Sequence, residues 1–283
     1  MMQFSYYPGC SLHSTAIEYD ASVRAAFERL GVQLKDLDDW NCCGASSAHS
    51  LNRELALALP ARNIAIAQEA GLDLVMPCAA CYSRHKAADH VLRTGNGQRR
   101  RIEEIASFTY SGTVGVRPLL DVVCSDIGLK RVGAAVVHPL SGLALVPYYG
   151  CLLVRPPEIA RFDDPENPRL MGELLQALGA EVRPWSYATE CCGGGLSITS
   201  PDVAGRLVRR LGERATEAGA AAIVTSCPLC QVNLEMRQAG QKLPVFYFTE
   251  LMGLAFGLPE VRRWWPKHLI DPRPLLKQAG LLG

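Results

Sequence analysis

Ten of the eleven cysteines in this 283-residue chain fall into two sets of five with the same pattern. Each set has a single cysteine, then an adjacent pair followed by glycine, then a C-x-x-C motif. The first set is Cys10, Cys42, Cys43, Cys78 and Cys81, and the second is Cys151, Cys191, Cys192, Cys227 and Cys230. Thiolates are soft ligands that select zinc, copper(I) or iron–sulfur centres, so this pattern indicates two metal centres.

The cellular context favours metal over disulfides. The first residues, MMQFSYYPGC, lack the basic and apolar regions of a secretory signal, so we expect a cytoplasmic protein. A reducing cytosol disfavours structural disulfides, and an odd number of cysteines does not suit a pure disulfide framework. We therefore interpret the two sets as ligands of redox-active or structural metal.

Each set has features that fit a cluster better than a single zinc ion. Zinc takes four tetrahedral ligands, and five thiols are one too many. Adjacent cysteines point in different directions, which suits separate metal atoms. Gly44 and the Gly193–Gly195 run let the backbone approach a bulky inorganic core and donate N–H groups to its sulfurs, although the run could also serve only as a turn. A zinc-stabilised structural protein remains the alternative.

The elements that must position these cysteines are also repeated. The same number of residues, 34, separates the adjacent pair from the C-x-x-C motif in both sets. The second copy has eight extra residues before its pair, which fall in the proline-rich stretch 155–168. In each half a strand-like run precedes the single cysteine and a buried strand precedes the C-x-x-C motif, with helical patterns between them. Expected strands are 4–7, 32–37 and the run 72–78, which ends on Cys78, then 143–149, 181–185 and the run 221–227, which ends on Cys227; expected helices are 16–30, 51–70, 170–178 and 201–218.

This rhythm predicts an α/β fold of two homologous βαβ-type halves, with parallel sheets related by a pseudo-twofold axis. We expect a first domain over 1–116, a connecting segment over 117–142, and a second domain with a C-terminal extension over 143–283. Functional groups of such sheets gather at the carboxyl ends of the strands. The cysteines lie at those ends, so we expect the two metal-binding edges to face one another across a cleft.

The remaining features exclude some functions. With 29 basic and 28 acidic residues the chain has no global attraction to nucleic acid, and its apolar stretches are too short or interrupted to span a bilayer. Cys124 belongs to neither set and is interpreted as a buried structural thiol. The six histidines share no spacing, although His13 and His49 lie close to motif cysteines. The tyrosines before each single cysteine are interpreted as packing residues.

The pattern C-x31-CC-x34-C-x-x-C, repeated as C-x39-CC-x34-C-x-x-C, resembles the tandem cysteine-rich CCG domains of the heterodisulfide reductase B subunit (HdrB). The resemblance covers nearly the whole chain, including PLSGLALVPYYGC before the second set. It implies a noncubane [4Fe–4S] cluster on each five-cysteine set, two clusters in all, with one cysteine of each set bridging irons. All ten matching ligand positions are present. Members of the family sometimes hold zinc in one motif.

The resemblance further implies the catalytic subunit of a heterodisulfide reductase-type complex, which reduces or forms a disulfide between the two clusters. The substrate would be a coenzyme M–coenzyme B type disulfide, or a disulfide or persulfide carried on a lipoate-bearing protein. The chain has no ferredoxin-like C-x2-C-x2-C-x3-C-P run. Expected partners are therefore a ferredoxin-like iron–sulfur subunit of the HdrC type and a flavoprotein of the HdrA type. A non-catalytic electron-relay subunit of a larger dehydrogenase complex is the alternative function.

Overall fold

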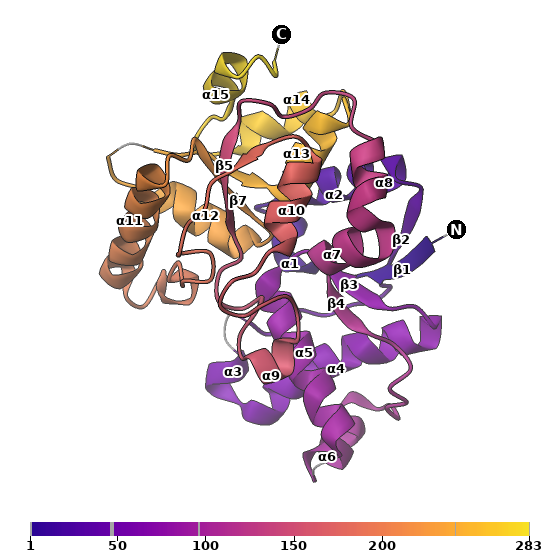
Figure 1. Ribbon diagram of the computed structural model, residues 1–283. Helices are drawn as coiled ribbons and strands as arrows, with labels where there is room; N and C mark the ends of the chain where they lie inside the picture. Colours follow the sequence, from indigo (N-terminus) through magenta and orange to yellow (C-terminus); the bar gives the residue numbers. More distant parts are fainter. Residues whose placement is uncertain (1, 46–47, 96, 241, 283) are drawn as a thin grey trace.

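The computed structural model describes residues 2–45, 48–95, 97–240 and 242–282. It contains two four-stranded sheets in which every strand pair is parallel. Helices surround both sheets, and the two halves lie against each other (Figure 1). This confirms the predicted α/β fold with two similar halves.

The first sheet has the strand order β2-β1-β3-β4. Its strands are β1 (Met2–Tyr6), β2 (Val32–Asp36), β3 (Leu74–Met76) and β4 (Val116–Pro118). The helices of this half are α1 (Gly9–Leu12), α2 (Ile17–Arg29), α3 (Ala48–Leu51), α4 (Arg53–Ala70), α5 (Ala79–Thr94) and α6 (Gln98–Ala106). All three residues of β3 are buried, as expected for a parallel strand covered on both faces.

The second sheet repeats that order as β6-β5-β7-β8. Its strands are β5 (Ala144–Tyr148), β6 (Glu181–Val182), β7 (Ala222–Thr225) and β8 (Val245–Tyr247). Its helices are α9 (Pro157–Ala160), α10 (Leu170–Ala177), α11 (Pro201–Glu217), α12 (Pro228–Arg237), α13 (Phe248–Ala255), α14 (Val261–Trp264) and α15 (Arg273–Gln278), with 3-10 turns at Gly194–Leu196 and Trp265–Lys267.

The helices begin and end at recognisable signals. The side chain of Asn52 caps α4 by accepting a hydrogen bond from the Leu55 N–H at 2.9 Å, and Gly71 ends the helix with a φ of 66°. Pro201 occupies the first turn of α11, where its missing N–H has no partner to lose. These residues fix the ends of α4 and the start of α11, the two long helices between each cysteine pair and its C-x-x-C motif.

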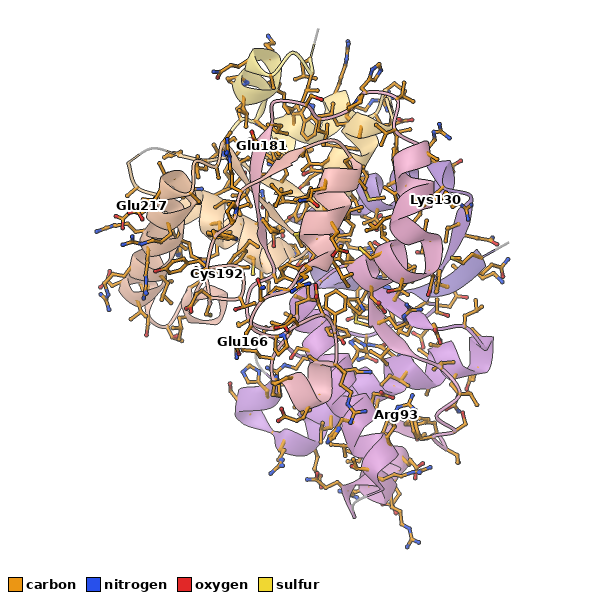
Figure 2. All side chains as sticks on the ribbon, viewed as in Figure 1. Arg93, Lys130, Glu166, Glu181, Cys192 and Glu217 are labelled. Carbon is orange, nitrogen blue, oxygen red and sulfur yellow. The ribbon has the colours of Figure 1, made fainter. Side chains whose placement is uncertain are left out.

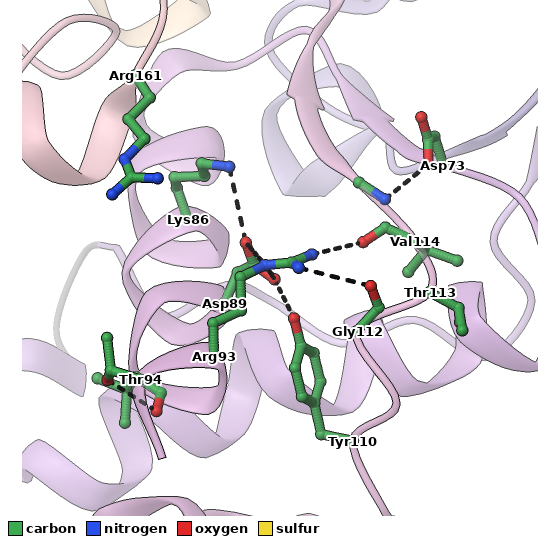
Figure 3. Close-up of polar contacts among 12 residues, drawn as sticks. Asp73, Lys86, Asp89, Arg93, Thr94, Tyr110, Gly112, Thr113, Val114 and Arg161 are labelled. Carbon is green, nitrogen blue, oxygen red and sulfur yellow. Dashed lines mark hydrogen bonds and ion pairs between the residues drawn. The ribbon is translucent and has the colours of Figure 1, made fainter. Parts of the chain in front are cut away.

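Helix α5 is fixed to the segment that leads into β4 (Figure 3). The buried carboxylate of Asp89 accepts hydrogen bonds from the Tyr110 hydroxyl at 2.6 Å and from Arg93 Nε at 2.9 Å, while Lys86 Nζ lies 3.6 Å away. Arg93 in turn donates to the carbonyl of Val114 at 3.1 Å. This network locks the helix whose first turn holds Cys81.

A helical segment connects the two halves and packs on the second. It consists of α7 (Leu119–Asp121), a π-helical stretch (Val122–Gly128) and α8 (Leu129–Ala134), and it contacts α10. In the second half, the helix that follows the last strand, α13, packs on α2 of the first half. The helix after the fourth strand of each sheet therefore packs against the other half. The domain boundaries expected after residues 116 and 142 remain predictions. Strand β4 (Val116–Pro118) spans the first of these boundaries.

Across the α2–α13 contact, aromatic and hydroxyl side chains meet. The Tyr19 ring stacks on the Tyr247 ring with centroids 3.9 Å apart and planes 4° from parallel. The hydroxyls of Ser22 and Thr249 are hydrogen-bonded at 2.6 Å. All four side chains are fully buried, and one apolar cluster contains residues of both halves. In the described segments, no helix combines the length and apolar character needed to cross a membrane.

Candidate iron–sulfur site

Both sets of cysteines lie beyond the carboxyl ends of three adjacent strands. In the first half, Cys10 lies in α1 after β1, and Cys42 and Cys43 lie in the loop after β2. Cys78 is the N-cap residue of α5, and Cys81 lies in the first turn of that helix. The second set follows β5, β6 and β7 in the same way, with Cys227 as the N-cap residue of α12.

The thiols form the same contacting pairs in each half. The sulfur atoms of Cys43 and Cys81 lie 3.4 Å apart, and those of their equivalents Cys192 and Cys230 lie 3.6 Å apart. These separations are well beyond a disulfide bond of about 2.05 Å. All eleven cysteines are free thiols.

Within each set, the single cysteine also lies near the first member of the adjacent pair. Burial and the neighbouring Cys10 thiol raise the pKa of Cys42, and the neighbouring Cys191 thiol and burial raise the pKa of Cys151. These are again equivalent positions of the repeat. The duplication in the sequence therefore extends to the arrangement of the thiols.

The two sets also lie near each other. The Cys227 thiol, at the equivalent position of the repeat, raises the pKa of the Cys78 thiol, and Ala79 and Ala80 next to Cys78 line the same cavity as Cys227. Both cysteine side chains are buried. The cysteine-bearing edges of the two sheets therefore meet at these two helix N-termini.

The residue before each single cysteine is a glycine, and a side chain at this position would crowd a neighbouring sulfur. A Cβ on Gly9 would lie 3.1 Å from the Cys81 sulfur, and a Cβ on Gly150 would lie 3.2 Å from the Cys230 sulfur. Both glycines also have positive φ values, 72° and 65°. The bare backbone here leaves the space beside the C-x-x-C thiol open.

Glycine after each adjacent pair supplies a hydrogen-bond donor. The Gly44 N–H donates to the Cys42 sulfur at 3.5 Å, and the Gly193 N–H donates to the Cys191 sulfur at 3.3 Å. The sequence predicted backbone donors at these glycines for the sulfurs of an inorganic core. The donors in the structure point at the cysteine sulfurs themselves.

A tyrosine ties the loop of each cysteine pair to the neighbouring strand end. The Tyr7 hydroxyl donates to the carbonyl of Asn41 at 3.0 Å, and the Tyr148 hydroxyl donates to the carbonyl of Glu190 at 2.7 Å. Both rings are fully buried. Each acceptor residue directly precedes its cysteine pair, so these tyrosines position the pair as well as fill space. Their recurrence three residues before each single cysteine was the signal in the sequence.

His85 supports the first set from behind. It is fully buried, its Nδ1 hydrogen-bonds to the Cys81 carbonyl at 2.8 Å, and its Nε2 lies 3.1 Å from Asn63 Nδ2. Burial lowers the pKa of His85 to about 4, so the ring is neutral at physiological pH. This neighbour carried no spacing signal in the sequence. The two histidines singled out there, His13 and His49, are exposed.

Local hydrogen bonds lower the pKa of one cysteine of the first adjacent pair and of both cysteines of the second. A hydrogen bond with the Cys81 thiol lowers the pKa of Cys43 to about 7. In the second half, hydrogen bonds with Cys151 and with the Gly193 N–H lower the pKa of Cys191 to about 6. Because thiolate is the form that binds metal, these thiols are prepared for ligation.

All five cysteines of the second set line one cavity of about 60 Å³. Ala79 and Ala80 of the first half close it on one side, so it lies between the halves. Cys192 is labelled near this junction in Figure 2, whereas Glu217 on α11 projects outward at the periphery. No acidic or basic side chain among the described residues lines the cavity, which leaves soft thiolate sulfur as the dominant donor.

The arrangement of donors fits a group with several metal atoms. Among the described residues, no group of three or more Cys, His, Asp or Glu side chains is close enough to hold a single metal ion. The five thiols of the second set nevertheless line one cavity, and Cys192 and Cys230 are in contact there. The donor set and cavity therefore suit an iron–sulfur cluster.

Cys124 lies apart from both sets. It is in the π-helical stretch between the halves, half-buried rather than buried, and its sulfur lies 3.6 Å from the carbonyl oxygen of Leu170. Burial raises its pKa, with a further contribution from Asp121. The thiol therefore stays protonated.

Comparison with known proteins gives the same assignment over both halves. The cysteine-rich domain family CCG matches residues 4–84 and 146–235. The 8-methylmenaquinol:fumarate reductase membrane anchor subunit of Wolinella succinogenes is 30% identical, covering 96% of this chain and 99% of that protein. A protein of Archaeoglobus profundus that is described as like the B subunit of heterodisulfide reductase is also 30% identical, covering 91% of each chain.

Two further relatives extend the comparison. The B subunit of the ferredoxin/F420H2-dependent CoB–CoM heterodisulfide reductase of Methanosarcina acetivorans is 26% identical, covering 91% of this chain and 90% of that one. The crystal structure of a hypothetical protein from Helicobacter pylori shares the fold, with a TM-score of 0.70 at 11% identity. That match covers 93% of this chain and 50% of the other. With both five-cysteine sets inside the matched segments, this chain belongs to the CCG cysteine-rich domain family, as an iron–sulfur subunit of the heterodisulfide reductase type.

Proposed function

We propose that this protein is the catalytic iron–sulfur subunit of a heterodisulfide reductase-type complex, which reduces or forms a disulfide between two noncubane [4Fe–4S] clusters. The observation that carries the proposal is the duplication of one thiol pair at two sheet edges, together with a cavity that residues of both halves line. A two-centre reaction needs both centres at a common space. The cavity bordered by both halves supports this.

The proposed ligands are the five cysteines of each set. Those of the first cluster are Cys10, Cys42, Cys43, Cys78 and Cys81, and those of the second are Cys151, Cys191, Cys192, Cys227 and Cys230. Their thiolates hold the clusters, while the N-termini of α5 and α12 favour the negative charge. Zinc in one of the motifs is the competing occupancy, and metal analysis distinguishes the two.

Reduction of a disulfide consumes two electrons and two protons and releases two thiols. The clusters, when bound, would supply or accept those electrons at the two ends of the sulfur–sulfur bond. The chain's own residues would orient the disulfide between the halves and keep water from it. No side-chain nucleophile is assigned, because the ten cysteines of the two sets are committed to ligation and Cys124 is remote and protonated.

Electrons would come from or go to separate subunits. We propose a ferredoxin-like iron–sulfur subunit of the HdrC type and a flavoprotein of the HdrA type as partners, because the relatives are themselves named as subunits of larger reductases. The Methanosarcina relatives are named for the CoB–CoM heterodisulfide. That disulfide, or a disulfide or persulfide on a lipoate-bearing protein, is the proposed substrate.

A second candidate is a non-catalytic electron relay in a larger dehydrogenase complex. One observation favours it: the Wolinella relative, which aligns over 99% of its length, is named a membrane anchor subunit of a fumarate reductase. In a relay the two clusters would act as successive carriers. Neither would then need to contact substrate.

Single-motif variants separate the two functions. Cys42→Ala and Cys191→Ala each remove a ligand from one set, and disulfide reduction is measured with an artificial electron donor beside iron content and spectra. The proposal expects each variant to lose turnover while the other half retains its cluster, because one centre can engage only one of the two sulfurs. Substantial turnover with either motif emptied would support the relay. Cys124→Ser is the matched control for loss of a thiol outside the sets.

A further inference from the structure

The second half leaves one side of helix α11 uncovered. In the first half, the equivalent helix α4 packs against both α5 and α6, and α6 lies between α5 and β4 in the chain. Between α12 and β8 the described residues, 238–240 and 242–244, form no helix, and α11 packs on α12 and on the 3-10 turn Gly194–Leu196. The far side of α11 lies at the periphery, where Glu217 projects outward (Figures 1 and 2).

This outer side of α11 is basic. The side chains of Arg206, Arg209 and Arg210 are exposed, and residues three and four apart share one face of a helix. In the segments that the structure describes, no carboxylate lies within ion-pair distance of these three, whereas Arg214 pairs with Glu217. The whole chain has a formal net charge of only +1, so the three arginines, here called the outer basic face, are a local concentration of positive charge.

The inner side of the same helix contacts the loop of the second cysteine pair. A Cβ on Gly193, the glycine after the pair, would lie 3.0 Å from atoms of both Ala204 and Leu207 on α11. The guanidinium of Arg210 lies 5.2 Å from the centre of the Tyr187 ring, in the loop that leads to the pair. A helix with its side chains is about 10–12 Å across. A protein bound to the outer basic face is therefore about one helix away from the second cysteine pair.

The turn that precedes α11 adds exposed apolar side chains. Leu196 is 40% exposed and Ile198 is 94% exposed. Protein interfaces combine apolar side chains with arginine, which is enriched there relative to other surfaces. An anionic membrane surface favours a uniformly basic face, but Asp202 and Glu213 are also exposed on α11. The mixed surface therefore fits a protein with acidic groups better than a membrane.

We propose that the outer basic face of α11 is the docking surface for the protein partner that exchanges electrons with the clusters, and that this partner presents an acidic face to it. The inference rests on the proposed function, which requires such a partner. Complementary charge would steer the partner to α11 and speed the encounter. Docking there brings the partner's redox centre close to a metal site, and electron exchange slows steeply with distance.

An acidic [2Fe–2S] ferredoxin of the plant type is the probe for this surface. Calorimetry measures its binding to the anaerobic native protein. Stopped-flow spectroscopy measures cluster reduction, in which one electron leaves each reduced ferredoxin and enters a cluster. We expect both binding and reduction to weaken between low and high salt, because the Debye length falls to about 3 Å at 1 M ionic strength.

Charge reversal on α11 locates the surface. The triple variant Arg206→Glu, Arg209→Glu, Arg210→Glu should bind the ferredoxin about tenfold more weakly and lose most of the salt dependence. Photoreduced deazaflavin, a small donor that needs no docking surface, should reduce its clusters at the native rate. That result would show that the variant is folded and its clusters are intact.

A matched control carries the same change in net charge elsewhere. The triple variant Arg262→Glu, Arg263→Glu, Lys277→Glu replaces exposed residues of α14 and α15. Helix α14 packs on α2 of the first half, and α15 lies apart from α11 (Figure 1). This variant should bind and accept electrons from the ferredoxin as the native protein does.

The inference is overturned if the native protein does not bind the ferredoxin, if the α11 variant binds it as tightly as the native protein, or if the control variant loses as much affinity. Sedimentation with phosphatidylglycerol vesicles tests the membrane. Vesicle binding that only the α11 variant loses, with ferredoxin binding retained, would also overturn it. Iron content is measured on the same samples. Absence of iron would contradict the proposed function, whereas calorimetry would still test the docking surface.

Discussion

Each cysteine pair is held by immediate neighbours that recur in both halves. A positive-φ glycine leaves room beside the C-x-x-C sulfur, and a second glycine donates its N–H to the first cysteine of the pair. A buried tyrosine holds the pair's loop by one hydrogen bond. These contacts give the thiols of both sets the same local arrangement.

The tyrosine clamp gives a test with an internal control. Tyr148→Phe removes only the hydroxyl that holds Glu190, which should cost about 0.5–1.5 kcal/mol and loosen the loop of Cys191 and Cys192. We expect faster loss of half of the iron to a chelator, with the remaining half released at the native rate. Tyr6→Phe is the matched control, because its hydroxyl bonds to Asp20 on α2 instead. Equal release rates in Tyr148→Phe and native protein would show that the clamp does not position the pair.

Cys124 should be replaceable. A serine hydroxyl at this half-buried position can still donate to the Leu170 carbonyl, so Cys124→Ser should cost no more than about 1–3 kcal/mol, the range for a polar group in an apolar site. Iron content should equal that of the native protein. Loss of a cluster would mean that the ligand sets are wrongly assigned.

Sequence reasoning found the cysteine sets because their spacing repeats, but it missed several of their neighbours. His85 lies a full helical turn beyond Cys81 and supports the Cys81 carbonyl, yet a lone histidine on a helix has no distinguishing pattern.

The C-terminal segment is attached to the cysteine-bearing helix α12 through a buried charge cluster. His268 lies between Glu235 on α12 and Glu250 on α13, at 3.1 and 2.9 Å, and all three side chains are fully buried. Burial alone would lower the pKa of His268, but the two carboxylates raise it to about 10. The imidazolium is therefore a structural cation at neutral pH.

This cluster predicts a specific pH dependence of stability. Because the folded pKa exceeds the unfolded value of about 6.5, the stabilisation is fully present below pH ~6.5 and is lost as pH rises through about 10. Removing one partner of a buried ion pair costs about 3–5 kcal/mol, so His268→Gln should be destabilised by that order near neutral pH. Urea denaturation between pH 6 and 10 measures both effects. A variant whose stability falls with pH as steeply as the native protein's would contradict this role for His268.

The elements themselves were predictable where the apolar pattern is long. The runs before the single cysteines became β1 and β5, and the long helical patterns became α2, α4 and α11. The fourth strand of each sheet was missed, because β4 and β8 have only three residues each and run directly into helices. The expected strand 181–185 is reduced to the two residues of β6, since Pro184 cannot continue the ladder.

The duplicated halves are joined more closely than a tandem repeat alone indicates. Each half receives a helix from the other's chain segment, and Tyr19 and Tyr247 stack between them. The repeat in the sequence predicted two similar halves with parallel sheets, because equal spacing requires equal elements. It could not show that the N-terminal ends of α5 and α12 line one cavity, since that depends on how the two halves pack.

That meeting of the two edges is the physical basis of the proposed two-cluster function. The ten thiols are arranged as two copies of one set, and the cavity at the second set is closed by residues of the first half. If the two sets held different metals, two similar thiol arrangements would bind two different centres.

Iron, zinc and acid-labile sulfide analysis of anaerobically purified protein tests this directly. Two four-iron clusters predict about eight iron atoms and about as many sulfides per chain, with no zinc. Four iron atoms with one zinc ion would contradict the symmetric two-cluster account, and the absence of iron would contradict the redox function altogether.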